Sequence, residues 1–131
     1  ATKIILPGVG SFDSAMQQLE QSDMLPSIEK LVLDQGVPFL GICVGMQLLA
    51  RSSDEGKLSG LGWVDANVRK FDKTLMPEGT CLPHMGWNDV EPLGDTILFK
   101  GLENDARFYF LHSYYFSNSI NCKMICENFF L

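Results

Sequence analysis

The first half of the chain alternates between short apolar runs and stretches whose apolar residues recur at helical spacing. Residues 3–6 form an apolar run that ends at 7–10, Pro-Gly-Val-Gly, which predicts a strand entering a glycine-rich turn. Ser11 is placed to cap a helix over 12–21. The apolar residues of this helix that share one face are Ala15, Met16 and Leu19.

A second helix and a buried strand follow. The helix is predicted to start at Pro26, a residue favoured in the first turn, and to end at Gly36. Its expected buried residues are Ile28, Leu31 and Val32. Residues 37–42 are apolar nearly throughout, which predicts a strand buried on both faces of a parallel sheet. This strand runs through Cys43 into a predicted helix over 44–51, and the segment has the form of a βα unit of a doubly wound sheet.

The second half changes character. A loop at 60–63 is followed by short extended pieces separated by turn residues, which predicts strands and hairpins rather than helices. The predicted extended pieces are 66–71, 85–90, 97–100 and 108–111. Residues 117–131 show no clear continuation of this pattern. The whole chain of 131 residues has the length of one domain.

Composition and charge narrow the function classes. With 46% apolar and 20% charged residues, the chain can build a core. A net charge of -6 argues against nucleic-acid binding, which favours a basic patch. No apolar run is long enough to span a bilayer, so no membrane contact is expected. The first residues lack the apolar stretch and cleavage site of a signal peptide, and a cytoplasmic location is expected.

The four cysteines do not form a metal-binding pattern. No pair has C-x-x-C spacing, and no histidine near Cys122 and Cys126 completes a zinc set, so neither a metal nor a cofactor is expected. Reduced thiols in the cytosol are the simplest interpretation. Cys81, Cys122 and Cys126 are expected to serve as small apolar side chains.

The sequence Gly41-Ile42-Cys43-Val44-Gly45 carries the clearest chemical signal. It places G-x-C-x-G at a strand-to-helix junction, the thiol form of a nucleophile elbow. Such a turn holds the nucleophile in a strained conformation above the sheet, and flanking glycines allow close approach of strand and helix. The N-terminus of the following helix favours a thiolate, and the Val44 N–H is placed to donate to an oxyanion.

Two interpretations of Cys43 remain at this point. It is either a nucleophile or a small residue that fits a crowded turn. The loop 7–10 favours the first, because in this architecture it lies beside the elbow and can offer a second oxyanion donor. A glycine turn by itself is a weak signal, since most such turns only reverse the chain.

Four sequence blocks resemble the class I glutamine amidotransferases. They are 6–12 (Leu-Pro-Gly-Val-Gly-Ser-Phe), 41–49 (Gly-Ile-Cys-Val-Gly-Met-Gln-Leu-Leu), 83–88 (Pro-His-Met-Gly-Trp-Asn) and 108–115 (Phe-Tyr-Phe-Leu-His-Ser-Tyr-Tyr). The last two blocks resemble the branch of glutaminase subunits that serve imidazole glycerol phosphate synthase. The resemblance implies a doubly wound, mostly parallel sheet with helices on both faces and a β-hairpin-rich second half. It covers residues 4–116, and residues 1–131 are expected to form a single, partial domain.

The resemblance also implies roles for individual residues. Cys43 would attack the side-chain amide of glutamine, which makes the family an enzyme family of glutaminases. The residues implied for the oxyanion and the substrate are Gly8, Val9, Gly10, Val44, Gln47, His112, Ser113 and Tyr114. The residues implied to face a (β/α)₈-barrel cyclase partner, which receives ammonia for histidine biosynthesis, are Trp87, Asn88 and Tyr109.

One part of the family pattern is missing. The family completes its triad with a histidine and a glutamate in an H-x-E pattern near the C-terminal end, and neither His84 nor His112 precedes such a glutamate. The chain is therefore expected to be a fragment, shortened at both ends. His112 is interpreted as a histidine in the pocket wall rather than a general base, because it lacks the acid partner.

Several alternative functions stay open from the sequence. A paralogous subunit could supply ammonia for the modification of surface-polysaccharide sugars, and an inactive scaffold would account for the missing H-x-E. Stress proteins and peptidases with a G-x-C elbow form another class, but they need neither the loop at 7–10 nor Gln47 one turn after the nucleophile.

Overall fold

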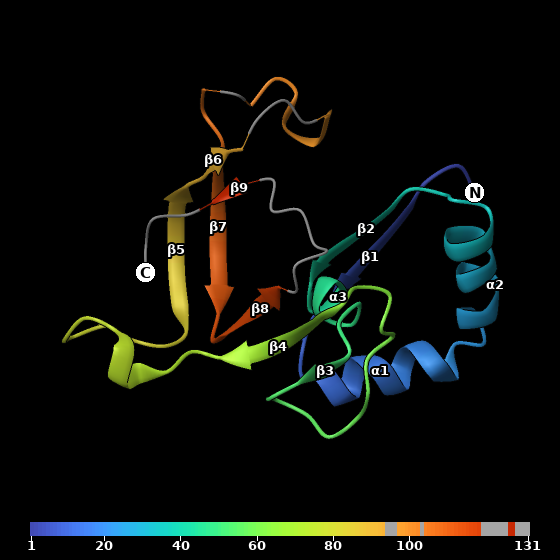
Figure 1. Ribbon diagram of the computed structural model, residues 1–131, viewed down its shortest axis with the longest axis horizontal. Coiled ribbons are helices and arrows are strands. Elements are labelled where there is room, and N and C mark those ends of the chain that lie inside the picture. The colour runs from blue at the N-terminus through green and yellow to red at the C-terminus, as the bar shows by residue number, and fades with distance from the viewer. Residues whose placement is uncertain (94–96, 103, 119–125, 128–131) are drawn as a thin grey trace. The chain divides into compact units, whose positions relative to one another are not determined.

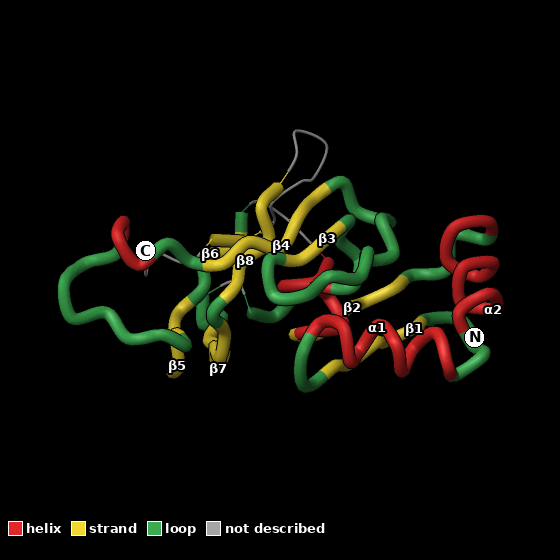
Figure 2. The backbone as a smooth tube through the Cα atoms, turned by 90° about the horizontal axis from the view of Figure 1, so that it is seen from below, coloured by secondary structure: helices red, strands yellow, loops and turns green. Residues whose placement is uncertain are grey.

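The computed structural model describes residues 1–93, 97–102, 104–118 and 126–127 (Figure 1). The chain folds as two compact units, and each is described by itself. Unit 1 comprises 1–69 with 116–119, and unit 2 comprises 70–115 with 120–131. The helices α1 to α3 belong to unit 1, drawn with red coils in Figure 2. The predicted α/β class is therefore confirmed.

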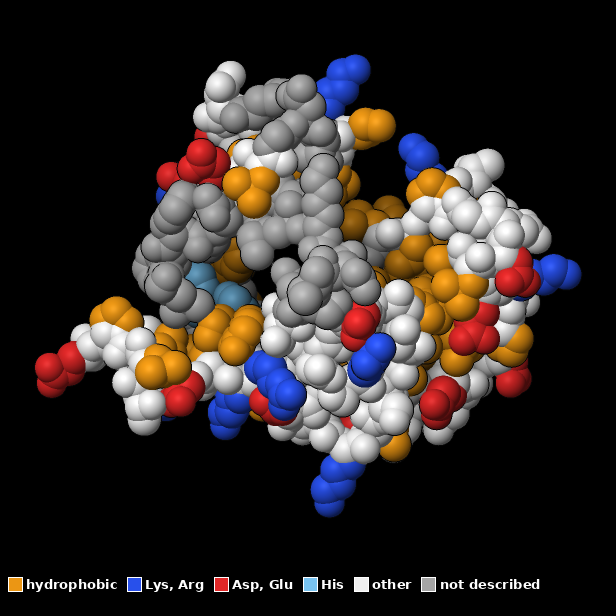
Figure 3. All heavy atoms as spheres, in the orientation of Figure 1, with side chains coloured by type: hydrophobic (Ala, Val, Ile, Leu, Met, Phe, Trp, Pro, Cys, Tyr) orange, Lys and Arg blue, Asp and Glu red, His pale blue; other side chains and the backbone are white. Residues whose placement is uncertain are grey.

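Two parallel strands form the centre of unit 1. The strand β1 (Ile4–Gly8) pairs with β2 (Phe39–Cys43), and the register sets Gly8 opposite Cys43. Both predicted strands are confirmed, but the prediction that the second is buried on both faces is wrong. Leu40 and Ile42 are 38% and 48% exposed, because among the described residues helices cover only the other face. Figure 3 shows hydrophobic side chains in orange over this region.

The helix α1 (Phe12–Gln21) has the predicted bounds and the predicted cap. The Ser14 backbone N–H donates to the Ser11 hydroxyl oxygen at 3.4 Å, which satisfies one of the N–H groups that a helix leaves unpaired at its start. Its apolar face packs onto the inner side of the β1–β2 pair. The buried residues of this core are Phe12, Met16, Leu19, Val44 and Leu48.

Two carboxylates tie the start of α1 to a distant loop. The Phe12 N–H donates to Glu55 Oε2 at 2.8 Å. The Asp13 carboxylate accepts from the backbone N–H groups of Lys57 and Leu58, each at 3.0 Å. These bonds hold the pKa of Asp13 below its usual value, and the bond from Lys57 has the largest effect. The anchored helix thus fixes the end of the loop 7–10 that leads into it.

The second predicted helix is present in two parts. It begins as α2 (Leu25–Glu29) and continues as the π-helical stretch η1 (Lys30–Asp34). Gly36 follows with a φ of +66°, the left-handed conformation that commonly ends a helix. The residues expected to be buried, Ile28, Leu31 and Val32, are only half-buried.

The third helix is shorter than the sequence predicts. It was expected over 44–51, but α3 spans only Val44–Gln47. The backbone then tightens, because Leu49 and Ala50 bond three residues back instead of four. Backbone N–H groups of the loop 60–64 donate to the carbonyls of residues 48–51, including Leu61 N–H to Leu48 O at 2.8 Å. Long-range backbone bonds therefore hold residues 48–51 in this tighter turn.

A small sheet of three strands belongs mainly to unit 1. These are β3 (Ser52–Ser53), β4 (Ala66–Lys70) and β8 (Tyr114–Asn118), in that order. The pairing of β3 with β4 is parallel. The predicted extended piece at 66–71 is confirmed by β4, whereas β3 and β8 were not predicted.

Unit 2 is built around one antiparallel pair, β5 (His84–Asp89) and β7 (Arg107–His112). Both strands were predicted. Smaller elements surround them: η2 (Lys73–Leu75), β6 (Glu91–Pro92), η3 (Ile97–Phe99) and β9 (Cys126–Glu127), where β6 and β9 are antiparallel. The buried core consists of Val90, Phe99 and Ala106, against which Phe110 packs.

One predicted extended piece of unit 2 is wrong. Residues 97–100 were expected to extend, but Ile97–Phe99 form the 3₁₀-helix η3. Only Phe99 is buried, while Ile97 is 94% exposed, so the apolar run does not form a strand buried along its length. Most of the stretch 117–131, including Cys122, lies outside the described residues.

Candidate active site

Cys43 lies at the junction of β2 and α3 with an unusual backbone. Its φ is +56° and its ψ is -123°, and its thiol is exposed. A residue with a side chain in such a conformation carries strain of roughly 1–3 kcal/mol, which persists only where the surrounding structure enforces it. The predicted strained turn with an exposed cysteine is confirmed as geometry. Its catalytic role remains a proposal.

Three glycines enforce this turn by close backbone contact. A Cβ on Gly8 would lie 2.6 Å from the Gly45 nitrogen, and one on Gly41 would lie 2.5 Å from the Met46 Cα. A Cβ on Gly45 would overlap the carbonyl oxygen of Leu6. Because these contacts are with backbone atoms, they cannot be relieved by turning a side chain. The predicted close approach of strand and helix is therefore confirmed.

The glycine-rich loop continues directly from the strand beside Cys43. Gly8 is the register partner of Cys43, so the loop begins next to the elbow. Gly10 has a φ of +95°, which favours glycine, and Val9 is exposed. Val44 is the first residue of α3, so its N–H has no acceptor within its own helix. An oxyanion site needs backbone N–H groups of this kind, and such a role for these residues is a proposal.

Unit 1 has two further features to note here, the side chain of Gln47 and a pocket beside the loop. Gln47 is in α3, and its buried Oε1 has no hydrogen-bond partner among the described residues. A buried polar atom without a partner costs free energy. A pocket of about 340 Å³ borders the loop, lined by residues that include Gly8, Val9, Gln18 and Leu48.

The predicted wall residues His112, Ser113 and Tyr114 belong to a bend in unit 2. His112 ends β7 and Tyr114 begins β8, with Ser113 between them. The His112 Nδ1–H donates to the Tyr114 carbonyl at 2.9 Å, and His112 Nε2 lies 3.0 Å from His84 Nδ1. Both ring nitrogens are thus engaged. The pKa of His112 lies below its usual value, mainly because the ring is partly buried. The bond to Tyr114 raises this pKa, and the charge of His84 lowers it by a smaller amount.

The three residues expected at the partner surface lie on two different faces of the β5–β7 pair. Trp87 and Tyr109 are register partners, 62% and 52% exposed, and their rings meet edge to face at 5.7 Å. Asn88 is 9% exposed, and its buried Oδ1 has no partner in the described part of the chain. Because side chains alternate along a strand, Asn88 lies on the face opposite Trp87.

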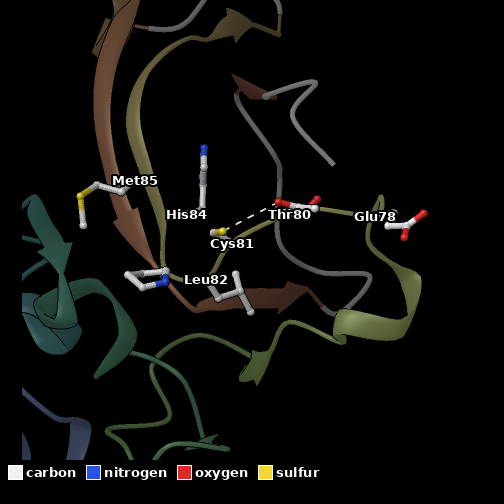
Figure 4. A pocket seen from close by; sticks show the side chains of 8 residues that line it. Glu78, Thr80, Cys81, Leu82, His84 and Met85 are labelled. Atoms are coloured by element: carbon white, nitrogen blue, oxygen red, sulfur yellow. Dashed lines mark hydrogen bonds between the residues drawn. The ribbon is translucent and has the colours of Figure 1, made fainter.

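A hollow of about 630 Å³ lies along the segment that leads into β5 and the first two residues of this strand (Figure 4). Its eight lining residues, 78–85, are consecutive, so it is the concave side of one loop. Cys81, expected to be a small apolar side chain, is exposed here and contacts the Gly79 carbonyl at 3.8 Å. Figure 4 shows His84 and Met85 pointing to opposite sides of β5.

The structure groups the predicted residues by unit. Unit 1 holds Cys43, Gly8, Val9, Gly10, Val44 and Gln47, and unit 2 holds His112, Ser113, Tyr114, Trp87, Asn88 and Tyr109. Sequence reasoning missed the contact of His84 with His112. The two histidines are 28 residues apart, and only the strand register brings them together. No local pattern could have indicated it. Among the described residues, no cluster of three metal ligands and no membrane-spanning helix is found.

Comparison with known proteins identifies the family. The model of the class-I glutamine amidotransferases matches residues 2–128, so the chain belongs to this family. A relative from Bdellovibrio bacteriovorus, named imidazole glycerol phosphate synthase subunit HisH, is 63% identical over 88% of this chain and 57% of its own length. Proteins of the same name from Leptospira interrogans and Methanocaldococcus jannaschii are 50% and 47% identical, over 87% and 92% of this chain and 56% and 58% of their own lengths. The chain thus spans little more than half the length of these relatives.

The elbow contact can be tested by adding one methyl group. Gly45→Ala should lower the free energy of unfolding by roughly 1–3 kcal/mol, because the new Cβ overlaps the Leu6 carbonyl. Gly36→Asn is the control, since nothing lies within 4 Å of its Cβ position and asparagine tolerates a positive φ. Urea unfolding measures both. Equal stability of the Gly45 variant and the unchanged protein would contradict the contact.

Proposed function

We propose that this chain is part of a glutaminase subunit of imidazole glycerol phosphate synthase, which hydrolyses glutamine and passes ammonia to a cyclase subunit in histidine biosynthesis. The observation that carries the proposal is the strained, exposed Cys43 at a strand-to-helix turn in a chain of the class-I family. The names of the relatives support the synthase branch. They give no support to the polysaccharide alternative.

Cys43 acts as the nucleophile in the proposed reaction. Its thiolate attacks the side-chain carbonyl carbon of glutamine, and the resulting oxyanion accepts hydrogen bonds from backbone N–H groups of Val44 and of the loop 8–10. The C–N bond then breaks, and the nitrogen takes up a proton and leaves as ammonia. Water hydrolyses the thioester on Cys43, which releases glutamate and restores the thiol.

The remaining polar residues bind glutamine in this proposal. The unpartnered Oε1 of Gln47 is suited to accept from the α-amino group of the substrate. The resemblance to the family also assigns His112, Ser113 and Tyr114 to glutamine binding. His112 is not assigned as the general base, because both of its ring nitrogens are engaged. The proton transfers are left to the H-x-E pair of the family, so the assays below use the complete protein.

The finer architecture is part of the same proposal. Residues 1–131 form part of a single domain with a doubly wound, mostly parallel sheet and helices on both faces. The outward side chains of Ile5, Leu40 and Ile42 support this arrangement, since an exposed apolar sheet face needs a covering layer. The cytoplasmic location stays a prediction.

The exposed face of β5–β7 is the proposed docking surface for the (β/α)₈-barrel cyclase. Its apolar residues form two register pairs: Met85 with Leu111 and Trp87 with Tyr109. Beyond them, Arg107 and Asp89 form an exposed ion pair at 3.5 Å, which gives the apolar surface a charged border. Exposed aromatic residues with a polar rim are typical of protein interfaces. The side chain of Asn88 is not assigned to this surface, because it is buried on the opposite face.

Replacing Cys43 tests the proposed reaction. In the complete protein with its cyclase, Cys43→Ala should lower the kcat for glutamine hydrolysis by at least about 10⁴-fold, because no thioester can form. Cys81→Ala is the control, since it removes the other exposed thiol among the described residues and should leave the rate within about twofold. Glutamate release measures both rates. Turnover that survives in Cys43→Ala would refute this nucleophile, and an inactive unchanged protein would favour a scaffold.

Replacing Trp87 tests the docking surface. Trp87→Ala in the complete protein should weaken cyclase binding by roughly 2 kcal/mol or more, since exposed aromatic residues commonly dominate interface energetics. Leu75→Ala is the control, because Leu75 is 84% exposed in the same unit but lies outside this face. Titration calorimetry measures the affinities. Unchanged affinity with a sharp loss of thermal stability would mean that Trp87 stabilises the fold and that the cyclase docks elsewhere.

A further inference from the structure

The carboxylate of Asp13 bridges the start of α1 and the loop 54–58. Its Oδ1 accepts from the backbone N–H groups of Lys57 and Leu58, each at 3.0 Å, and its Oδ2 shares the Lys57 N–H at 3.0 Å. These bonds join residues that are 44 and 45 positions apart in the sequence. We call the three bonds the Asp13 clamp.

The loop 54–58 has the space that this carboxylate needs. A Cβ on Gly56 would overlap Asp13 Oδ1 and would lie 3.2 Å from the Phe12 ring. The absence of a side chain at this position therefore lets the carboxylate reach its two N–H partners. A second tie runs beside the clamp, since the Phe12 N–H donates to Glu55 Oε2 at 2.8 Å.

The loop 54–58 is itself attached to the part of the chain that carries Cys43. The Asp54 N–H donates to the carbonyl of Val68 in β4 at 2.9 Å. The loop also follows α3 and β3 along the chain, and all of these elements belong to unit 1. The clamp therefore ties the start of α1 to the same compact unit that positions the elbow.

The loop 8–10 lies between two fixed ends. Its first residue packs against the backbone of α3, where a Cβ would lie 2.6 Å from the Gly45 nitrogen. Asp13 fixes the other end, three residues after Gly10. Between these ends Val9 is 89% exposed, and nothing in the described chain lies within 4 Å of a Cβ position at Gly10. The position of the loop N–H groups thus depends on the two ends rather than on packing of the loop itself.

We propose that Asp13 is a positioning residue for the oxyanion: by clamping the start of α1 to the loop 54–58, it fixes the N–H groups of the loop 8–10 that stabilise the charge on the substrate carbonyl oxygen. This inference rests on the proposed function, because an oxyanion forms only if Cys43 attacks an amide carbonyl. Asp13 itself need not touch glutamine. Its removal should leave the fold intact, because water can replace it at the exposed N–H of Lys57.

Removing the clamp should impair catalysis more than substrate binding. In the complete protein, Asp13→Ala should lower the kcat for glutamine about tenfold while KM changes less than about threefold, because oxyanion bonds act mainly in the transition state. The loss is smaller than for a deleted donor, since the loop is displaced rather than removed. Glu20→Ala is the control, because Glu20 is an exposed acid of the same helix and its loss should leave kcat within about twofold.

Gly56→Ala tests the clamp from its other side. The new Cβ should push the Asp13 carboxylate away from its partners and lower kcat by a similar factor. In the double variant with Asp13→Ala, the substitution at Gly56 should lower kcat by less than about a further twofold, because the clamp is already gone. Full multiplication of the two effects would show that they act independently, and it would overturn the clamp as their common cause.

Two further measurements separate positioning from a general loss of structure. In alkylation by iodoacetamide, the Cys43 sulfur displaces iodide from a saturated carbon and no oxyanion forms, so its rate in Asp13→Ala should stay within about twofold. Peptide mass spectrometry measures this rate at Cys43. Backbone nitrogen-15 relaxation should show Val9 and Gly10 more mobile in Asp13→Ala than in the unchanged protein. Thermal melting shows that each variant is folded.

The outcomes distinguish this inference from the function on which it rests. An unchanged kcat in Asp13→Ala, an equally rigid loop, or alkylation of Cys43 slowed as much as catalysis would overturn the positioning role. An unfolded Asp13→Ala variant would also overturn it, since the clamp would then serve the fold. If the unchanged complete protein did not hydrolyse glutamine, the proposed function would fail, and the role of Asp13 would fail with it whatever the mobility of the loop.

Discussion

The first turn of α3 lies so close to β1 and β2 that three facing positions have no room for a Cβ atom. Gly8, Gly41 and Gly45 fill these positions, and the atoms they face belong to the backbone. This contact offsets the strain of Cys43, whose φ of +56° would otherwise relax. The exposed thiol, the loop that starts at Gly8 and the position of Gln47 all depend on it. A backbone contact is well suited to this task, since backbone atoms cannot move away as side chains do.

Much of unit 1 could be predicted from the sequence, because local signals and packing agree there. The helix 12–21 has its predicted bounds, set by the cap at Ser11 and by a clear apolar face. Predictions failed where long-range backbone bonds decide the outcome. The helix after Cys43 ends at Gln47 and the backbone tightens there, where the loop 60–64 bonds the carbonyls of residues 48–51. No periodicity within 44–51 reports on a partner that lies more than ten residues away.

The candidate site also has one part that local sequence signals predict and one part that long-range pairing decides. The G-x-C-x-G pattern is local, so the elbow at Cys43 could be predicted with its strain and its glycines. The second unit depends on register, which the sequence does not reveal. Its pairing gives Trp87 an exposed partner in Tyr109, buries Asn88 on the other face and joins His84 to His112. The sequence block 83–88 groups Trp87 with Asn88, but strand alternation separates them.

The central claim is that the strained Cys43 forms a covalent bond with the glutamine side chain. The most direct measurement treats the complete protein with a glutamine analogue that carries an electrophilic side chain and maps the adduct by peptide mass spectrometry. The account predicts one adduct, on Cys43, and protection of this residue by an excess of glutamine. Labelling of Cys81 instead, or labelling that glutamine does not prevent, would contradict the account.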